Sequence, residues 1–171
     1  MESFLRYWLD WPVVVTFMSS TWGWPLVEIL HFVGLSLLVG AVGMFDLRLL
    51  GVAKQLPAAP LHGLLRWGVF GFVLCVVTGL LFVLGLRANL YDGHAYDVLM
   101  NDGFLQAKLA FMLFAGLNLL AFYTTGMSRA VRELGPGDDA QPAAKTVAAM
   151  SLFLWAGVIY FGRLIPWDLA G

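Results

Sequence analysis

The chain has little of what soluble, disulfide-bonded or nucleic-acid-binding proteins are built from. Charged residues make up 12% of its 171 residues, about half of the roughly 25% that is usual in soluble domains. Its single cysteine, Cys75, lies in an apolar run, which excludes a disulfide framework and a CxxC motif for metal or haem attachment. There is no tract rich in lysine and arginine, so we expect no nucleic-acid partner.

Long apolar stretches dominate the sequence instead. Hydrophobic residues make up 60% of the chain, more than a single domain of this size can bury away from water. Four stretches have the roughly 17 to 25 residues that a membrane span requires, at about 24–45, 67–86, 104–123 and 146–163. Because lipid offers the backbone no hydrogen bonds, each is predicted to be a helix. We expect a single all-α domain over 1–171, a polytopic membrane protein with a bundle of four transmembrane helices.

The segment before the first span, at about 3–20, mixes aromatic residues with charged ones. It places Trp8 and Trp11 beside Arg6 and Asp10. This mixture is typical of a short helix in the headgroup layer, so an N-terminal interfacial helix is predicted. The alternative is an apolar segment that packs against the bundle.

Lysine and arginine give the predicted orientation, because cytoplasmic loops carry an excess of both. Six of these residues follow spans one and three, and four lie toward the opposite face. We therefore expect a multi-pass protein of the cell inner membrane, surrounded by the lipid bilayer, with both termini extracytoplasmic. The six are Arg48, Lys54, Arg66, Arg129, Arg132 and Lys145, and the four are Arg6, Arg87, Lys108 and Arg163.

Polar groups from all four spans fall in the same predicted half of the bundle. A helix rises about 1.5 Å per residue, which places His31 roughly 10 Å inside span one and Glu28 about one turn nearer the surface. Thr78 lies roughly 12 Å inside span two, Lys108 roughly 8 Å inside span three, and Arg163 at the outer end of span four. An ionisable group inside a span costs about 2.5 to 3.5 kcal/mol, so the shared depth predicts a functional site.

Two interpretations of this site stay open. In the first, a cofactor lies between facing helices, with His31 as one axial ligand of haem iron and the unprotonated amine of Lys108 as the other. Gly34 shares a helix face with His31 and permits either a flat macrocycle or close helix packing, and Arg163 or Arg87 donates to haem propionates. In the second, Glu28 pairs with Lys108 or Arg163 in a structural network that holds no cofactor.

Two further polar residues are predicted to lie outside the site. Asp46 closes span one in the stretch DLRLLG and is interpreted as an interface anchor and helix stop. His62 follows two prolines on the cytoplasmic side and is interpreted as a solvated loop residue.

Five segments carry a family resemblance and together cover most of the chain. They are WPLVEILHFVGLSLLVG, DLRLLG, TGLLF, FLQAKLAFMLFAGLN and SLFLWAGVIYFGR. In this order and spacing they resemble a family of small bacterial four-helix membrane proteins of unknown function. The resemblance implies the fold and supplies no activity.

The histidine of span one and the lysine of span three also look like the arrangement in the four-helix membrane protoporphyrinogen oxidase. That resemblance implies a b-type haem between His31 and Lys108. The other signature stretches of that enzyme are not evident here, so oxidation of porphyrinogen is not carried over. The copper-resistance D membrane proteins are similar bundles, which implies copper handling as an alternative.

One function is therefore expected, with two alternatives. The expected function is a haem b-binding membrane protein that passes electrons between a membrane carrier and an extracytoplasmic or periplasmic redox protein. The first alternative is a membrane protein that handles a metal such as copper, or protons, through the same residues. The second is a structural subunit of a larger membrane complex. Whether the chain is an enzyme does not follow from these patterns.

Overall fold

The computed structural model describes residues 2–88 and 94–169, with side chains described as far as Pro166. This part of the chain is helical and contains no strand. Four of its helices are long and apolar enough to span a membrane, as a multi-pass membrane protein requires. They are α3 (Gly23–Leu50), α4 (Ala58–Gly85), α6 (Gly103–Thr124) and α8 (Pro142–Leu169).

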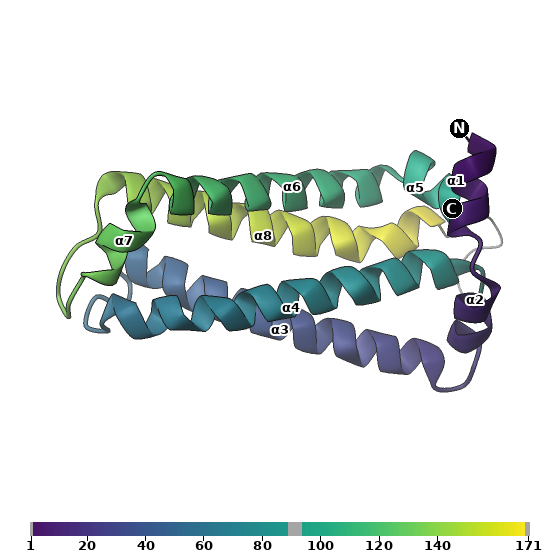
Figure 1. Cartoon of the computed structure of the whole chain (residues 1–171), viewed down its shortest axis with the longest axis horizontal. Helices are drawn as coiled ribbons and strands as arrows, with labels where there is room; N and C mark the ends of the chain where they lie inside the picture. Colours follow the sequence, from purple (N-terminus) through teal and green to yellow (C-terminus); the bar gives the residue numbers. More distant parts are fainter. Residues whose placement is uncertain (1, 89–93, 170–171) are drawn as a thin grey trace.

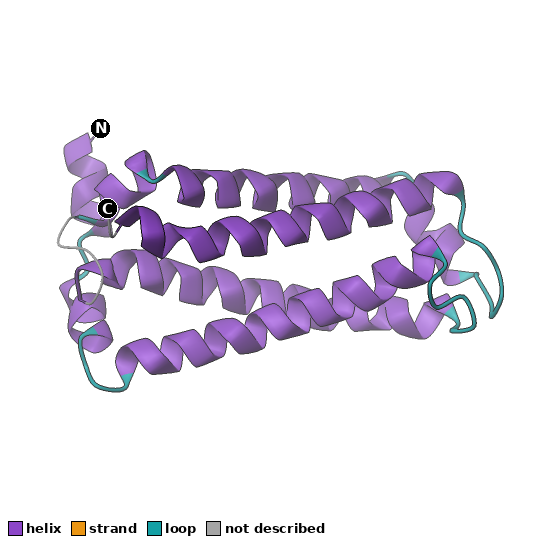
Figure 2. Cartoon of the chain, turned by 180° about the vertical axis from the view of Figure 1, so that it is seen from behind, coloured by secondary structure: helices purple, strands orange, loops and turns teal. Residues whose placement is uncertain are grey.

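Short helices lie at the two ends of the four-helix bundle (Figures 1 and 2). One end carries α7 and the loops at 51–57 and 133–141, and is called the loop end below. The other carries the N-terminal helices and α5, and is called the terminal end. The short elements are α1 (Glu2–Leu9), α2 (Pro12–Met18), the 3-10 turn η1 (Leu86–Ala88), α5 (Ala95–Asn101) and α7 (Met127–Arg132).

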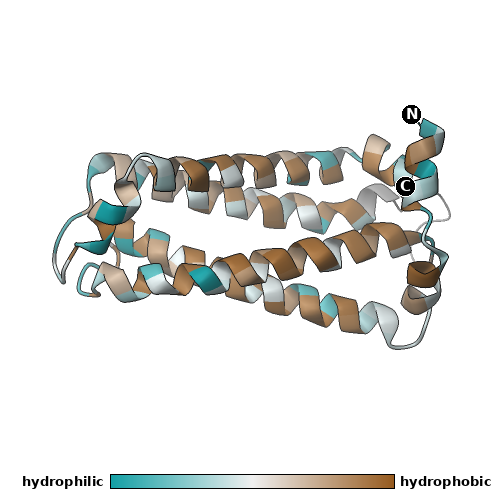
Figure 3. Cartoon of the chain, viewed as in Figure 1, coloured by the Kyte–Doolittle hydropathy of each residue, from teal (hydrophilic) through white to brown (hydrophobic). Residues whose placement is uncertain are grey.

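The four long helices form two pairs. α3 packs along α4 and α6 packs along α8, and Figure 1 shows the pairs as two layers. Contacts between α3 and α8 join the layers. Mostly apolar residues run along the long helices, while hydrophilic residues gather toward the two ends (Figure 3). The predicted four-helix architecture is therefore confirmed, whereas insertion into a membrane and the orientation stay predictions.

Glycines allow α3 and α4 to approach closely. A Cβ added at Gly71 would lie 2.5 Å from the Gly34 carbonyl oxygen and 2.7 Å from the Leu38 nitrogen. A Cβ added at Gly34 would lie 2.9 Å from both the Cys75 Sγ and the Gly71 carbonyl oxygen. Of the two uses open to Gly34, the structure therefore shows close helix packing, because no space beside it is left for a flat ring.

α4 begins earlier than span two was expected to begin, at Ala58 in place of Trp67. Pro57 precedes its first residue, and Pro60 sits in the first turn, where a missing N–H costs no helical hydrogen bond. His62 therefore lies on a helix, half-buried, with its Nε2 2.9 Å from the Ser128 hydroxyl and its ring against Phe45. The interpretation of His62 as a solvated loop residue is wrong, because two prolines at a helix start were taken as a loop signal.

The N-terminal segment forms two short helices where one was expected. Val14 and Met18 of α2 are buried against the terminal end of α4, as in the alternative of a packed apolar segment. Tyr7 and Trp8 of α1 stay exposed, as an interfacial helix requires. Their position in a headgroup layer stays a prediction.

An ion pair ties α1 to α5 at the terminal end. The Arg6 guanidinium donates to both carboxylate oxygens of Asp97 and lies 4.8 Å from the centroid of the Tyr96 ring. The hydrogen bond from Arg6 lowers the pKa of the Asp97 carboxyl below its ordinary value. The contact joins segments that are far apart in the sequence, so it fixes the position of α1.

A buried arginine closes the loop end. Arg48, in the last turn of α3, has no exposed surface. Gly51 ends α3 in the left-handed region, at φ 95°, and turns the chain back toward this side chain. The guanidinium donates to three backbone carbonyls, those of Leu56 at 2.5 Å, Gly135 at 2.8 Å and Asp138 at 3.2 Å. Arg48 therefore holds both loops of this end together.

Candidate functional site

A side-chain hydrogen bond joins the His31 ring on α3 to α4. Its Nδ1 lies 2.7 Å from the Oγ1 of Thr78, which is buried and 1% exposed. The Thr78 hydroxyl itself lies 2.7 Å from the carbonyl oxygen of Leu74 and donates its one proton there. With that proton on Leu74, Oγ1 accepts from Nδ1–H of His31, and this tautomer leaves Nε2 unprotonated with its lone pair available.

The His31 ring is also positioned by packing. Phe82 meets it edge-on, with the two ring centroids 5.5 Å apart. The small Gly79 lies beside the ring, since a Cβ there would be 3.8 Å from the His31 Cε1. The imidazole is half-buried and held by one hydrogen bond and one aromatic contact, so its orientation is fixed as that of a ligand usually is.

Lys108 reaches the same cluster from α6. Its charge acts on both His31 and Cys75, so the ammonium lies within electrostatic range of each. The stem of Lys108 packs on α8 at Gly162, where an added Cβ would meet its Cδ and Nζ at 3.3 Å. The thiol of Cys75 lies 3.5 Å from the His31 carbonyl oxygen. All four long helices thus contribute to one cluster in the terminal half of the bundle.

Glu28 and Arg163 lie outside this cluster. Both side chains are exposed, and across the described residues no ion pair joins Glu28 to Lys108 or to Arg163. The structural network that sequence analysis kept open, with Glu28 as the counter-charge, is therefore not formed. A direct role for Glu28 or Arg163 at a cofactor stays a prediction.

The cluster resembles a ligand pair and not a bare metal site. Within residues 2–88 and 94–169, no three His, Cys, Asp or Glu residues gather in an arrangement that could hold a metal ion. The groups that do gather are one imidazole with an available nitrogen and one primary amine. Such a pair can bind a metal whose remaining ligands come from a cofactor, as the porphyrin supplies them to iron in haem.

Sequence reasoning missed two members of the cluster and a separate buried carboxylate. Cys75 was interpreted as a small hydrophobic residue, and Gly162 carried no signal because its role is to leave room for Lys108. Asp46 was placed at the membrane interface, whereas it is 5% exposed inside the bundle. The stretch DLRLLG does end the helix, because α3 stops at Leu50 and Gly51 is its cap, while an anchor at a membrane interface stays a prediction.

The chain stands apart from the known proteins with which it was compared. No protein-family model, no curated protein and no solved structure matches it. The family resemblances given above therefore stay predictions, and the function has to be argued from the geometry of the site.

Proposed function

We propose that the protein binds haem b in the terminal half of its bundle and transfers electrons. The observation that carries the proposal is the hydrogen bonding of the two ring nitrogens of His31. Its Nδ1–H is engaged by Thr78 while Nε2 is available, and Lys108 lies within electrostatic range. An imidazole oriented through its other nitrogen is the usual form of a histidine that binds iron.

The donor set supports haem over copper. Copper and zinc sites take three or four protein ligands, whereas haem iron needs one or two because the porphyrin supplies the rest. The described part of the chain holds no three-residue metal cluster, and the pair of His31 and Lys108 meets the smaller requirement. When bound, the haem supplies one-electron redox chemistry.

Each residue has a separate task in this proposal. Thr78 fixes the tautomer of His31 and thereby which nitrogen faces the iron. Lys108 is the second ligand in its unprotonated form, a form favoured by its position in the bundle and by the lack of a carboxylate partner among the described residues. Arg163, exposed near the end of α8, is placed to donate to propionate groups at the surface.

The location of the site favours a particular kind of partner. The cluster lies in the terminal half, which the lysine and arginine bias assigns to the extracytoplasmic side of the cell inner membrane. A haem held there by His31 and Lys108 would supply one-electron chemistry to a membrane-dissolved carrier and to an extracytoplasmic redox protein.

An absorption spectrum of the detergent-purified protein tests the proposal. The protein is expressed with an adequate haem supply and measured oxidised and after reduction with dithionite. We expect a Soret band that sharpens on reduction, disappears in His31→Ala and shifts in Lys108→Ala. His94→Ala and Lys145→Ala serve as matched controls, because each removes the same side chain from a position away from the cluster, and both should keep the wild-type spectrum.

The opposite result has a definite meaning. If the wild-type protein shows no Soret band and contains no metal, the haem proposal fails and the cluster serves to join helices. If the band is present but insensitive to His31→Ala, haem is bound elsewhere and the assignment of ligands fails.

A further inference from the structure

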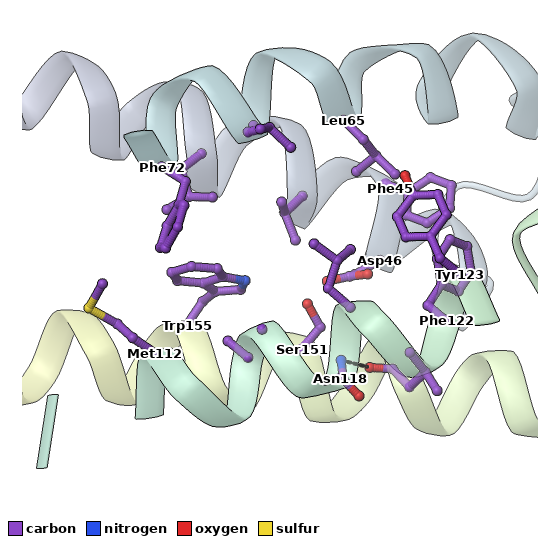
Figure 4. A pocket seen from close by; sticks show the side chains of 18 of the residues that line it. Phe45, Asp46, Leu65, Phe72, Met112, Asn118, Phe122, Tyr123, Ser151 and Trp155 are labelled. Atoms are coloured by element: carbon purple, nitrogen blue, oxygen red, sulfur yellow. Dashed lines mark hydrogen bonds between the residues drawn. The ribbon is translucent and has the colours of Figure 1, made fainter. Parts of the chain in front are cut away.

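A cavity of about 190 Å³ lies between the two layers of the bundle, toward the loop end. Residues of all four long helices line it, and most of them are apolar. Figure 4 shows Phe72 and Trp155 on one side, Phe45 and Phe122 on the other, and Asp46 between them. The cavity is therefore an aromatic enclosure with one acidic group.

Asp46 is buried without a full set of partners. Its side chain is 5% exposed, and it lines the cavity together with Ser151 of α8. Its second carboxylate oxygen, Oδ2, is buried and has no hydrogen-bond partner among the described residues. A buried carboxylate oxygen that accepts nothing is costly, so its retention points to a ligand that supplies the donor.

Among the described residues, no cation forms an ion pair with this carboxylate. Arg48 lies two residues further along α3, but its donors are taken by the carbonyls of the loop end. Asn118 also lines the cavity, and its amide nitrogen donates to the Val147 carbonyl oxygen at 3.0 Å. None of the four ion pairs of the described residues includes Asp46. In its charged form, Asp46 therefore needs a counter-charge from outside the described part of the chain.

We propose that this cavity binds a small organic cation, an amine carried on a single ring, with Asp46 as its counter-charge. A protonated amine satisfies the free oxygen of Asp46 and also interacts favourably with the faces of surrounding aromatic rings. The size agrees, because an engineered apolar cavity of about 150 Å³ in another protein binds benzene.

Other classes of ligand fit the cavity less well. A metal ion such as Ca²⁺ needs six or more oxygen ligands, and Asp46 and Ser151 supply too few. An anion would be repelled by the carboxylate. A neutral alcohol would satisfy the free oxygen but leave a net charge buried among apolar side chains. An organic cation meets both the hydrogen-bonding and the charge requirement.

The cavity is separate from the His31 cluster. Fifteen positions along α3 separate His31 from Asp46, which corresponds to about 22 Å of helix. The cation site neither requires haem nor is excluded by it, so either proposal can fail without the other.

Calorimetric titration of the detergent-solubilised full-length protein tests the cation site. The probe is benzylammonium, which carries one ring and one ammonium group, and benzyl alcohol is its neutral counterpart of similar shape. Titration of each probe into empty micelles gives the blank. We expect saturable binding of benzylammonium to the wild-type protein. Benzyl alcohol should bind more weakly by at least about tenfold, because it cannot form the charge-assisted hydrogen bond.

Two variants locate the site. Asp46→Asn keeps the shape of the side chain and removes the charge, and should weaken benzylammonium binding by about tenfold or more. Glu133→Gln removes an exposed acidic charge from the same end of the bundle and should leave binding unchanged. A third variant, Ala115→Leu, reduces the cavity from its α6 wall and should weaken both probes.

Thermal unfolding of each variant separates loss of binding from loss of fold. We expect Asp46→Asn to unfold at or above the wild-type temperature, because it removes a buried charge without a cation partner. The proposal is overturned if benzylammonium does not bind the wild type, if benzyl alcohol binds equally well, or if Asp46→Asn binds as the wild type does. If Asp46→Asn unfolds, Ala115→Leu decides, since unchanged binding there also overturns the site.

Discussion

Arg48 at the loop end and His31 in the terminal half are held by the bundle in different ways. At the loop end, Arg48 is fully buried and three backbone carbonyls from two loops accept its hydrogen bonds. In the terminal half, His31 has one side-chain partner, Thr78, and keeps an available nitrogen. A buried side chain whose nitrogens all have hydrogen-bond partners within the protein indicates a structural role. A buried side chain with one nitrogen left available indicates a site that has room for a ligand.

The largest effect is expected from Arg48→Met at the loop end. The substitution keeps an unbranched apolar stem but leaves the carbonyls of Leu56, Gly135 and Asp138 without their donor. We expect the free energy of unfolding to fall by about 3 kcal/mol, since hydrogen bonds to charged groups contribute about 1.5 to 3 kcal/mol each and water offsets part of the loss. Denaturant titration in detergent, followed by circular dichroism, measures it.

The control for this prediction is Arg132→Met, which removes an exposed arginine near the same end. It should change the free energy of unfolding by less than about 0.5 kcal/mol. Equal effects of Arg48→Met and Arg132→Met would show that the loop end does not depend on the buried guanidinium, and the contrast between the two ends would be lost.

A smaller effect is expected from Thr78→Val in the terminal half. Valine has nearly the shape of threonine but cannot accept the Nδ1–H of His31. We expect a loss of about 1 kcal/mol in the free energy of unfolding, the usual value for one interhelical hydrogen bond. Thr78→Ser keeps the hydroxyl and should lose less. A loss in Thr78→Val as large as in Arg48→Met would mean that the site is as structural as the loop end.

The smallest effect is expected at the half-buried ion pair of Arg6 and Asp97. Because Arg6 lowers the pKa of Asp97 in the folded state, this pair stabilises the docking of α1 above the ordinary carboxyl pKa of about 4. The stabilisation is lost as the pH falls through the lowered folded pKa. Spin labels at Ser3 and Met100 should give a narrow distance distribution at pH 6 and a broader one at pH 3, where the pair has begun to lose its stabilisation.

Asp97→Asn is the matched control for this pH dependence. It should give the broad distribution at both pH values, because the amide cannot be neutralised by a proton. A distribution that stays narrow in the variant, or that does not change with pH in the wild type, would show that α1 is held by the packing of α2 alone.

Much of the fold could be predicted from the sequence. Apolar runs of membrane length fixed the number of long helices, because lipid leaves the backbone no other way to satisfy its hydrogen bonds. Helix ends were less predictable. α4 starts at Ala58 and α3 continues to Leu50 because a helix does not stop at the first polar residue of an apolar run. That difference moved His62 onto a helix and Asp46 into the interior.

Part of the candidate site could also be predicted from the sequence. His31, Thr78 and Lys108 stood out because polar groups inside apolar spans are rare and their depth follows from helical rise. Which of them face one another depends on helix rotation, and that rotation is set by the close contact of Gly34 with Gly71. Depth alone put Glu28 in the site, whereas the rotation of α3 leaves it on the surface.

By itself, the sequence determined that four apolar helices form and that polar groups lie within them, since both follow from local composition and the geometry of a single helix. Only the tertiary structure decided which polar groups meet, which are satisfied and where a cavity remains. Those properties depend on how helices pack against one another. Asp46 shows the difference, because nothing in DLRLLG distinguishes a charge at a membrane surface from a carboxylate beside a buried cavity.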